Sequence, residues 1–172
     1  MKHPIIKLII LPLAVIITAR LWLGPLPPAK RPTTAPTSRP SPRVAPSASE
    51  AMVGAMDATW AAVCRVESGY DLAAYNPREQ AAGIAQIRPI CLVDANRIVR
   101  LSGGPGQTWT MADRYDPAKA RAIFATYTTY YARDRQCPEV WARIWNGGPD
   151  GMTKPATLNY WRRVRAAMGA EL

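Results

Sequence analysis

The fold is decided by residues 56–69, which read MDATWAAVCRVESG. The large apolar residues of this stretch recur at steps of four and three, the spacing of one helical face, and Glu67 continues that face at a further step of four. Gly69 follows and is the residue type that most often ends a helix. The residues that share the face are Met56, Trp60, Val63 and Glu67. The stretch therefore predicts an amphipathic helix whose last turn carries a glutamate on its apolar side.

The position of Glu67 has a chemical consequence. Burying an unpaired carboxylate is costly, so such a group tends to stay protonated. The negative end of the helix dipole disfavours the charged form by a further amount of about 0.3–1 kcal/mol. Both effects raise the pKa of Glu67, and a carboxyl group protonated near neutral pH is what a glycosidase uses to protonate a leaving glycosidic oxygen. The alternative is that Glu67 pairs with Arg65 or Arg88, or that it reaches solvent.

Helix boundaries can be placed along the rest of the chain. Ser47 and Glu50 fit a capping box, which places the start of the first helix near residue 48. Prolines suited to the first turn of a helix begin four more helices, at Pro89, Asp116-Pro117, Pro138 and Pro155. Convincing two-residue alternation is absent. We expect a mainly α single domain over residues 50–172, with at most a small hairpin near Tyr75–Ile84.

Apolar residues at helical spacing predict which helix faces are buried. In the helix that begins at Pro89, the expected face consists of Ile90, Val93, Ile98 and Leu101. In the helix that begins at Pro117, it consists of Ile123, Tyr127, Tyr130 and Tyr131. In the last helix, it consists of Leu158, Trp161, Val164 and Met168. We expect these faces to form the core.

Four short motifs resemble the successive motifs of the soluble lytic transglycosylase (SLT) family. They are Val-Glu-Ser-Gly at 66–69, Gly-Ile-Ala-Gln at 83–86, Trp-Asn-Gly-Gly at 145–148 and Asn-Tyr-Trp at 159–161. Their order and spacing agree with the family over nearly all of residues 55–168. Ile84 and Ala85 depart from the usual Leu-Met pair, and Trp145 stands where tyrosine is common. The resemblance implies a lysozyme-like fold, α+β with minimal β.

The resemblance also implies a reaction. Glu67 matches the single acid/base of a peptidoglycan lytic transglycosylase. It would protonate the β-1,4 glycosidic oxygen between N-acetylmuramic acid (MurNAc) and N-acetylglucosamine (GlcNAc), and then accept the proton of the muramoyl 6-hydroxyl. That hydroxyl closes on C1 and gives a 1,6-anhydromuramoyl product without water. The chemistry needs no cofactor and no metal ion.

Four further residues match positions of the family that hold the substrate or the acid. Ser68 matches a serine that orients the glutamate or a sugar. Gln86 and Asn146 match amide side chains that face the glycan, which suits the recognition of hydroxyl and N-acetyl groups. Tyr160 matches a tyrosine whose hydroxyl bonds the catalytic carboxyl group. For Ser68 the alternative is a polar residue at a helix end, and for Tyr160 it is a core tyrosine.

Hydrolysis is the alternative reaction, and it requires a second carboxylate. Glycosidases that invert or retain the anomeric configuration use a pair of acids. Glu79 is the candidate second carboxylate, in a polar loop after the first motif, and Asp71 is a weaker one because it follows a turn. With a second acid the chain would be an inverting muramidase, similar to goose-type lysozyme. A non-catalytic glycan-binding module is the third hypothesis, and it would not need Glu67.

The N-terminal residues differ in composition from the rest of the chain. Residues 1–49 hold seven of the 22 Lys and Arg residues and none of the 12 acids. Residues 1–23 have the length and charge of a signal peptide, or of an N-terminal membrane anchor over residues 5–23. Residues 24–49 contain eight of the 17 prolines and are expected to form a disordered linker. We therefore expect export to the cell envelope (periplasm), with an N-terminal segment able to contact the membrane.

Two other classes of function find no support in the sequence. Zinc-ligand spacing and nucleic-acid recognition motifs are absent, so neither a metal nor a nucleic acid is expected as a partner.

The three cysteines, Cys64, Cys91 and Cys137, make an odd number, so they cannot all pair with one another. Either Cys91 pairs with Cys137, or all three are buried free thiols.

Overall fold

The computed structural model describes residues 45–103 and 109–169. The predicted leader of residues 1–23 and the linker up to residue 44 lie outside the described residues. Within the described ranges, no helix is both long enough and apolar enough to span a bilayer.

The described part is mainly helical with one small antiparallel sheet, which confirms the expected mainly α fold with minimal β structure. In β1 and β2, Tyr75 pairs with Ala82 and Asn76 pairs with Ala81. The elements in chain order are α1 (Ala48–Ser68), β1 (Tyr75–Asn76), β2 (Ala81–Ala82), α2 (Pro89–Leu101), η1 (Ala112–Tyr115), α3 (Pro117–Ala132), α4 (Pro138–Gly147), η2 (Gly151–Thr153) and α5 (Ala156–Gly169).

The helix boundaries follow the local chemistry that the sequence indicates. Ser47 and Glu50 form the predicted capping box, in which each side chain accepts a hydrogen bond from the other residue's backbone N–H. Gly69 ends α1 with a left-handed φ of 64°. Asp116 caps α3 by accepting from the N–H groups of Ala118 and Lys119. The predicted starts of α2, α3 and α4 are therefore confirmed to the residue, and α5 begins directly after Pro155.

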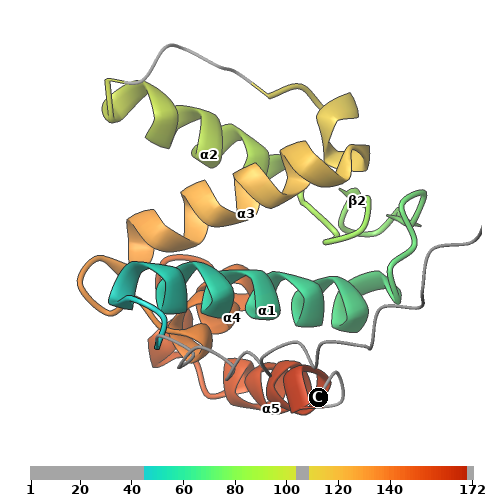
Figure 1. Ribbon diagram of the computed structural model, residues 1–172. Coiled ribbons are helices and arrows are strands. Elements are labelled where there is room, and N and C mark those ends of the chain that lie inside the picture. The colour runs from blue at the N-terminus through green and yellow to red at the C-terminus, as the bar shows by residue number, and fades with distance from the viewer. Residues whose placement is uncertain (1–44, 104–108, 170–172) are drawn as a thin grey trace, which may run out of the picture. The chain divides into compact units, whose positions relative to one another are not determined.

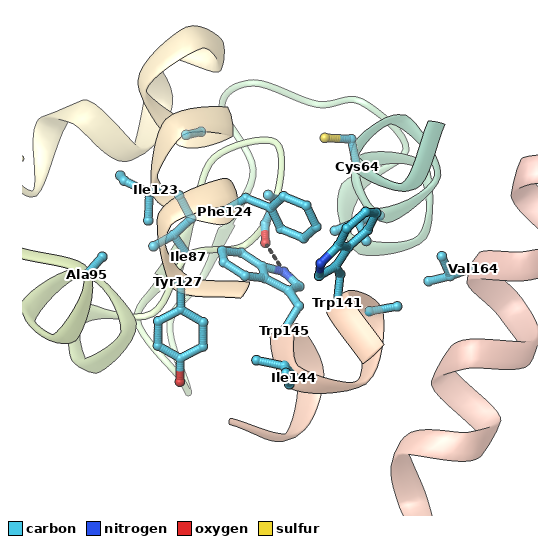
Figure 2. Packing of buried hydrophobic residues seen from close by; sticks show 14 of the residues in the cluster. Cys64, Ile87, Ala95, Ile123, Phe124, Tyr127, Trp141, Ile144, Trp145 and Val164 are labelled. Carbon is cyan, nitrogen blue, oxygen red and sulfur yellow. Dashed lines mark hydrogen bonds between the residues drawn. The ribbon is translucent and has the colours of Figure 1, made fainter. Parts of the chain in front are cut away.

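The core is centred on α4, which packs against α1, α3 and α5 (Figure 1). Six consecutive residues of α4 are buried, from Val140 to Trp145. The rings of Phe124 and Trp145 meet edge to face with centroids 5.1 Å apart (Figure 2). In Figure 1, α3 lies between α2 and α1, and it contacts both of them. The buried helix α4 is therefore closely packed on three sides.

The buried face of α2 differs from the prediction. Ile90 and Val93 are 76% and 59% exposed, and Leu101 is exposed as well. The residues that α2 turns toward the core are Leu92, Ala95 and Ile98. The prediction was right for Ile98 and wrong for the other three residues, because it followed the large aliphatic residues, whereas α2 packs against α3 with the small Ala95 buried. Tyr130 and Leu158 are also exposed, contrary to the faces expected for α3 and α5.

A buried arginine holds the hairpin in place. Arg114 of η1 donates through Nη1 to the carbonyl oxygens of Gln80 and Ile87, at 2.7 and 2.9 Å. Gly83 lies so close to this arginine that a Cβ atom there would be 1.9 Å from its carbonyl oxygen. The hairpin and η1 are thus fastened together by contacts that no sequence motif indicates.

All three cysteines are free thiols. Cys64 is buried in α1, Cys91 is partly buried in α2, and Cys137 is exposed before α4. The predicted Cys91–Cys137 pair is not formed, and the alternative is right that the thiols are free but wrong that all three are buried.

Candidate active site

A cleft of about 870 Å³ lies where the ends of several elements meet. Its lining comes from the last turn of α1, the hairpin, one face of α2, the middle of α3 and the segment that joins α4 to α5. The lining includes Glu67, Asn76, Glu79, Gln86, Arg88, Tyr127, Asn146 and Gly148. The structure therefore brings together, in one cleft, residues that the sequence separates by some 80 positions.

Glu67 is half-buried at the C-terminal end of α1, and its carboxyl group has one defined partner. The hydroxyl of Tyr160 in α5 donates a hydrogen bond to Glu67 Oε1 at 2.8 Å. Among the described residues, Glu67 forms no ion pair with Arg65 or Arg88, so the structural alternative of a paired glutamate does not hold.

Burial raises the pKa of the Glu67 carboxyl above its ordinary value. The hydrogen bond from Tyr160 opposes this effect most strongly, because it stabilises the carboxylate. The positive charges of Arg163 and Arg88 also lower the pKa, and the negative charge of Glu79 raises it. Burial is the largest of these causes, so the group favours its protonated form at higher pH than a free glutamate does.

Tyr160 is suited to remain a donor. Its side chain is only 3% exposed, and burial raises its pKa well above the ordinary value, with a further rise from the neighbouring Glu67. The guanidinium of Arg163 lies over the Tyr160 ring at 5.5 Å from the centroid. The phenol therefore stays protonated and is held in place from α5.

Gln86 projects from the tight turn that follows the hairpin, where its own φ is 50°. Its amide nitrogen donates to the carbonyl oxygens of Gly83 and Ala74, at 3.0 and 3.3 Å. These bonds fix the amide plane and use its donors, and no described residue donates to its oxygen. Gln86 thus lines the cleft with an acceptor available to a ligand.

Ser68 has a different position from the one that its motif implies. Its hydroxyl donates to the carbonyl oxygen of Ile84 at 2.7 Å, which fastens the end of α1 to the turn before Gln86. The residue is outside the set that lines the cleft. Its role in orienting the acid or a sugar stays a prediction.

Arg88 connects three sides of the cleft, and the sequence indicated it only as a partner of Glu67. It lies just before α2, and its Nη2 donates to the backbone oxygen of Asn146 at 3.2 Å. Its Nε is 3.7 Å from Glu79 Oε2.

The two candidate second carboxylates have different positions. Glu79, 55% exposed, lines the cleft, whereas Asp71 caps a turn by accepting from the N–H of Ala73 at 2.8 Å. Of the two candidate second carboxylates, only Glu79 faces the site.

Part of the lining was missed by the sequence analysis. Tyr127 was assigned to the core, and Cys91, Asp94 and Arg97 of α2 carry no recognisable motif. Cys91, Asp94 and Arg97 reach the cleft from one side of α2, and Tyr127 reaches it from α3. In the described part of the chain, no group of three or more His, Cys, Asp or Glu side chains is placed to hold a metal ion.

Comparison with known proteins bears on the fold and the family of the chain. No protein-family model matches the chain. The lysozyme of Magallana gigas is 33% identical over 112 residues, which cover 59% of this chain and 72% of that protein. The lysozyme of Ostrea edulis is 34% identical over 91 residues, and lysozyme 1 of Crassostrea virginica is 31% identical over 109. The matches cover 51% and 60% of this chain but only 61% and 55% of those two relatives.

Two solved structures are also similar. The Tapes japonica lysozyme superposes with a TM-score of 0.51 at 25% identity, over 62% of this chain and 85% of that chain. The Meretrix lusoria lysozyme, in a complex with Aeromonas hydrophila PliI, gives 0.52 at 26% identity, over 63% and 87%. The fold and the cleft thus define a lysozyme-like protein, as expected.

The chain belongs to the family of invertebrate-type lysozymes. The resemblance of its motifs to soluble lytic transglycosylases predicted the correct superfamily, but the relatives found by comparison are invertebrate lysozymes rather than members of that family.

Proposed function

We propose that this chain cleaves the β-1,4 bond between MurNAc and GlcNAc in peptidoglycan glycan strands, with Glu67 as the general acid. The proposal is carried by one observation: a half-buried carboxyl group with a raised pKa lines an extended cleft and accepts a hydrogen bond from a buried phenol. The relatives' shared name, lysozyme, supports the same class of activity.

The geometry indicates which oxygen delivers the proton. Tyr160 donates to Glu67 Oε1, so the proton of the neutral carboxyl group resides on the other oxygen, Oε2. Transfer of this proton to the glycosidic oxygen lets the bond to C1 break and the leaving sugar depart as an alcohol. The carboxylate that remains is stabilised by the Tyr160 hydrogen bond and by the charges of Arg163 and Arg88. These groups therefore act when negative charge develops on Glu67.

Hydrolysis is the outcome that we propose for the second half of the reaction. Glu79 lines the same cleft, its carboxylate is held by Arg88, and the relatives are named as lysozymes. In this pathway a water molecule adds to C1 and transfers a proton to a carboxylate. Asp94 also lines the cleft, but it is held by Arg97 and by the hydroxyl of Tyr131.

Lytic transglycosylation is the second candidate, and a specific observation favours it. Glu79 is largely exposed and bound to Arg88, whereas Glu67 is half-buried and its burial raises its pKa, which suits a carboxyl group that acts first as the acid and then as the base. In this pathway the Glu67 carboxylate accepts the proton of the muramoyl 6-hydroxyl, whose oxygen closes on C1. The product is a 1,6-anhydromuramoyl end, and no water is consumed.

Product mass separates the two reactions. We expect soluble fragments from purified peptidoglycan to end in reducing MurNAc, which is heavier by one water than the anhydro form. A Glu79→Gln variant should lose activity if hydrolysis uses this carboxylate, and should keep it if the 6-hydroxyl is the nucleophile. A wild-type protein that binds peptidoglycan and releases nothing would favour the non-catalytic glycan-binding module instead.

The proposed substrate also bears on location. Peptidoglycan lies outside the cytoplasmic membrane, so cleavage requires export of the chain. The basic and apolar residues 1–23 support this proposal, either as a cleaved signal peptide or as an anchor over residues 5–23.

A further inference from the structure

One tyrosine of the cleft wall presents its hydroxyl group to the cleft. Tyr127 of α3 is only 6% exposed and lines the cleft, and its hydroxyl forms no hydrogen bond to any described residue. In the described part of the chain no buried side-chain oxygen or nitrogen atom lacks a hydrogen-bond partner, so this hydroxyl is accessible from the cleft although its ring is buried. We propose that the Tyr127 hydroxyl binds an oxygen atom of the glycan strand, which makes Tyr127 a substrate-binding residue. This inference rests on the proposed function.

The ring of Tyr127 is locked before any ligand arrives. It meets the Trp145 ring edge to face at 6.2 Å and the Tyr131 ring at 5.0 Å. Trp145 is itself fixed, because its indole N–H donates to the carbonyl oxygen of Ala85 at 3.3 Å. Figure 2 shows the Tyr127 hydroxyl pointing away from this packed cluster. A group held in this way loses little conformational freedom when it binds a ligand.

The hydroxyl lies at the end of the cleft where α4 ends. A Cβ atom added to Gly148 would be 3.8 Å from it, and the glycine leaves this space open. Asn146 lies two residues before Gly148 and lines the same cleft. A sugar that contacts Asn146 and the backbone at Gly148 is therefore within reach of the Tyr127 hydroxyl.

The chemistry of the group suits a glycan oxygen. Burial raises the pKa of Tyr127, and the neighbouring Cys91 and Tyr131 raise it further, so the phenol is protonated at neutral pH. A protonated phenol donates one hydrogen bond, and a glycan strand offers hydroxyl and N-acetyl carbonyl oxygens as acceptors. The ligand that we infer is thus a sugar acceptor oxygen.

The test measures binding without cleavage. In a Glu67→Gln background, the affinity for uncut MurNAc–GlcNAc oligosaccharides is measured by calorimetry with and without Tyr127→Phe. We expect Tyr127→Phe to weaken binding about tenfold, because one hydrogen bond to the ligand is lost. In the active enzyme the same change should raise KM more than it lowers kcat.

Tyr115→Phe is the matched control. Tyr115 is exposed and lies outside the cleft lining, so the loss of its hydroxyl should leave glycan affinity unchanged. Tyr127→Phe should leave the Tm unchanged, because its hydroxyl bonds no described residue. The inference is overturned if Tyr127→Phe binds glycan as tightly as its parent, if it lowers the Tm, or if Tyr115→Phe weakens binding by the same factor. A parent that binds no glycan at all overturns the proposed function, and this inference with it.

Discussion

At the scale of single residues, the properties of Glu67 depend on groups from four parts of the chain. Its own helix buries it, Tyr160 and Arg163 approach from α5, Arg88 from the start of α2, and Glu79 from the hairpin. Burial raises the pKa, and the two arginines with the tyrosine limit the rise. This balance keeps the acid protonated before the reaction and stabilises it as a carboxylate afterwards.

Removal of the Tyr160 hydroxyl changes this balance in a known direction. The hydrogen bond lowers the Glu67 pKa, so Tyr160→Phe should raise that pKa further. Because the protonated acid is the active form, the alkaline limb of the kcat/KM profile should move to higher pH. The maximal rate should fall about tenfold as Glu67 loses its orientation.

The measurement is a pH–rate profile with peptidoglycan as substrate. Tyr75→Phe serves as the control, since Tyr75 is exposed and lies outside the cleft lining. An alkaline limb that stays in place or moves to lower pH in Tyr160→Phe would contradict this account of Glu67.

Much of the site can be predicted from residue types and spacing, and some of it cannot. The position of Glu67 on an apolar helix face predicted the direction of its pKa shift, which the structure reproduces through burial. The motif resemblance indicated Gln86 and Asn146, which line the cleft. Tyr127 and Arg88 were not assigned to the site, because their places depend on how α2, α3 and α4 pack.

At the scale of elements, the hairpin depends on Gly83, which begins the Gly-Ile-Ala-Gln motif, and on Arg114, which no motif indicates. Gly83 adopts a left-handed φ of 74° against the backbone of Arg114, and the Arg114 side chain holds the carbonyl oxygens on both sides of β2. The hairpin in turn positions Glu79 and Gln86 in the cleft. A change in the hairpin geometry would therefore displace these two side chains from the cleft.

Gly83→Ala should destabilise the fold by more than about 2 kcal/mol, because the added Cβ atom meets backbone and the left-handed conformation disfavours alanine. Gly54→Ala is the matched control. Gly54 lies in α1 with open space around its Cβ position, so alanine there should stabilise the helix by about 0.5–1 kcal/mol. Urea unfolding measures both changes, and a Gly83→Ala variant as stable as wild type would refute the tight packing.

The capping residues predicted where the helices begin, but not which face of α2 is buried. Proline and capping patterns act locally, so Pro89 and Asp116 suffice to place a helix start. The buried face depends on the partner helix, and the contact with α3 selects Ala95 over the larger Ile90. A prediction from spacing alone therefore assigns Ile90 and Val93 to the core, although both are exposed in the cleft lining.

At the scale of the whole molecule, helix packing around α4 stabilises the described fold without any disulfide. We expect the Tm to be the same with and without dithiothreitol, because the three cysteines are free thiols. Differential scanning calorimetry under both conditions is the measurement. A Tm that falls by roughly ten degrees on reduction would indicate a bridge, since a native disulfide contributes about 2–4 kcal/mol.

Whole-chain motif order predicted the lysozyme-like superfamily, but the family itself came from comparison with complete sequences and structures. Glu-Ser-Gly and Asn-Gly-Gly each stand at the C-terminal end of a helix, and such points recur among related folds. Four motifs in order therefore identify an architecture more reliably than a reaction.

Release of soluble fragments from purified peptidoglycan tests the central claim most directly, with wild type compared with Glu67→Gln and with Glu50→Gln as a control outside the cleft. Glu67→Gln preserves the acceptor for Tyr160 but removes the transferable proton, so its rate should fall by at least about a hundredfold. Glu50→Gln should match wild type. Fragments released by Glu67→Gln at the wild-type rate would contradict the assignment of Glu67 as the acid.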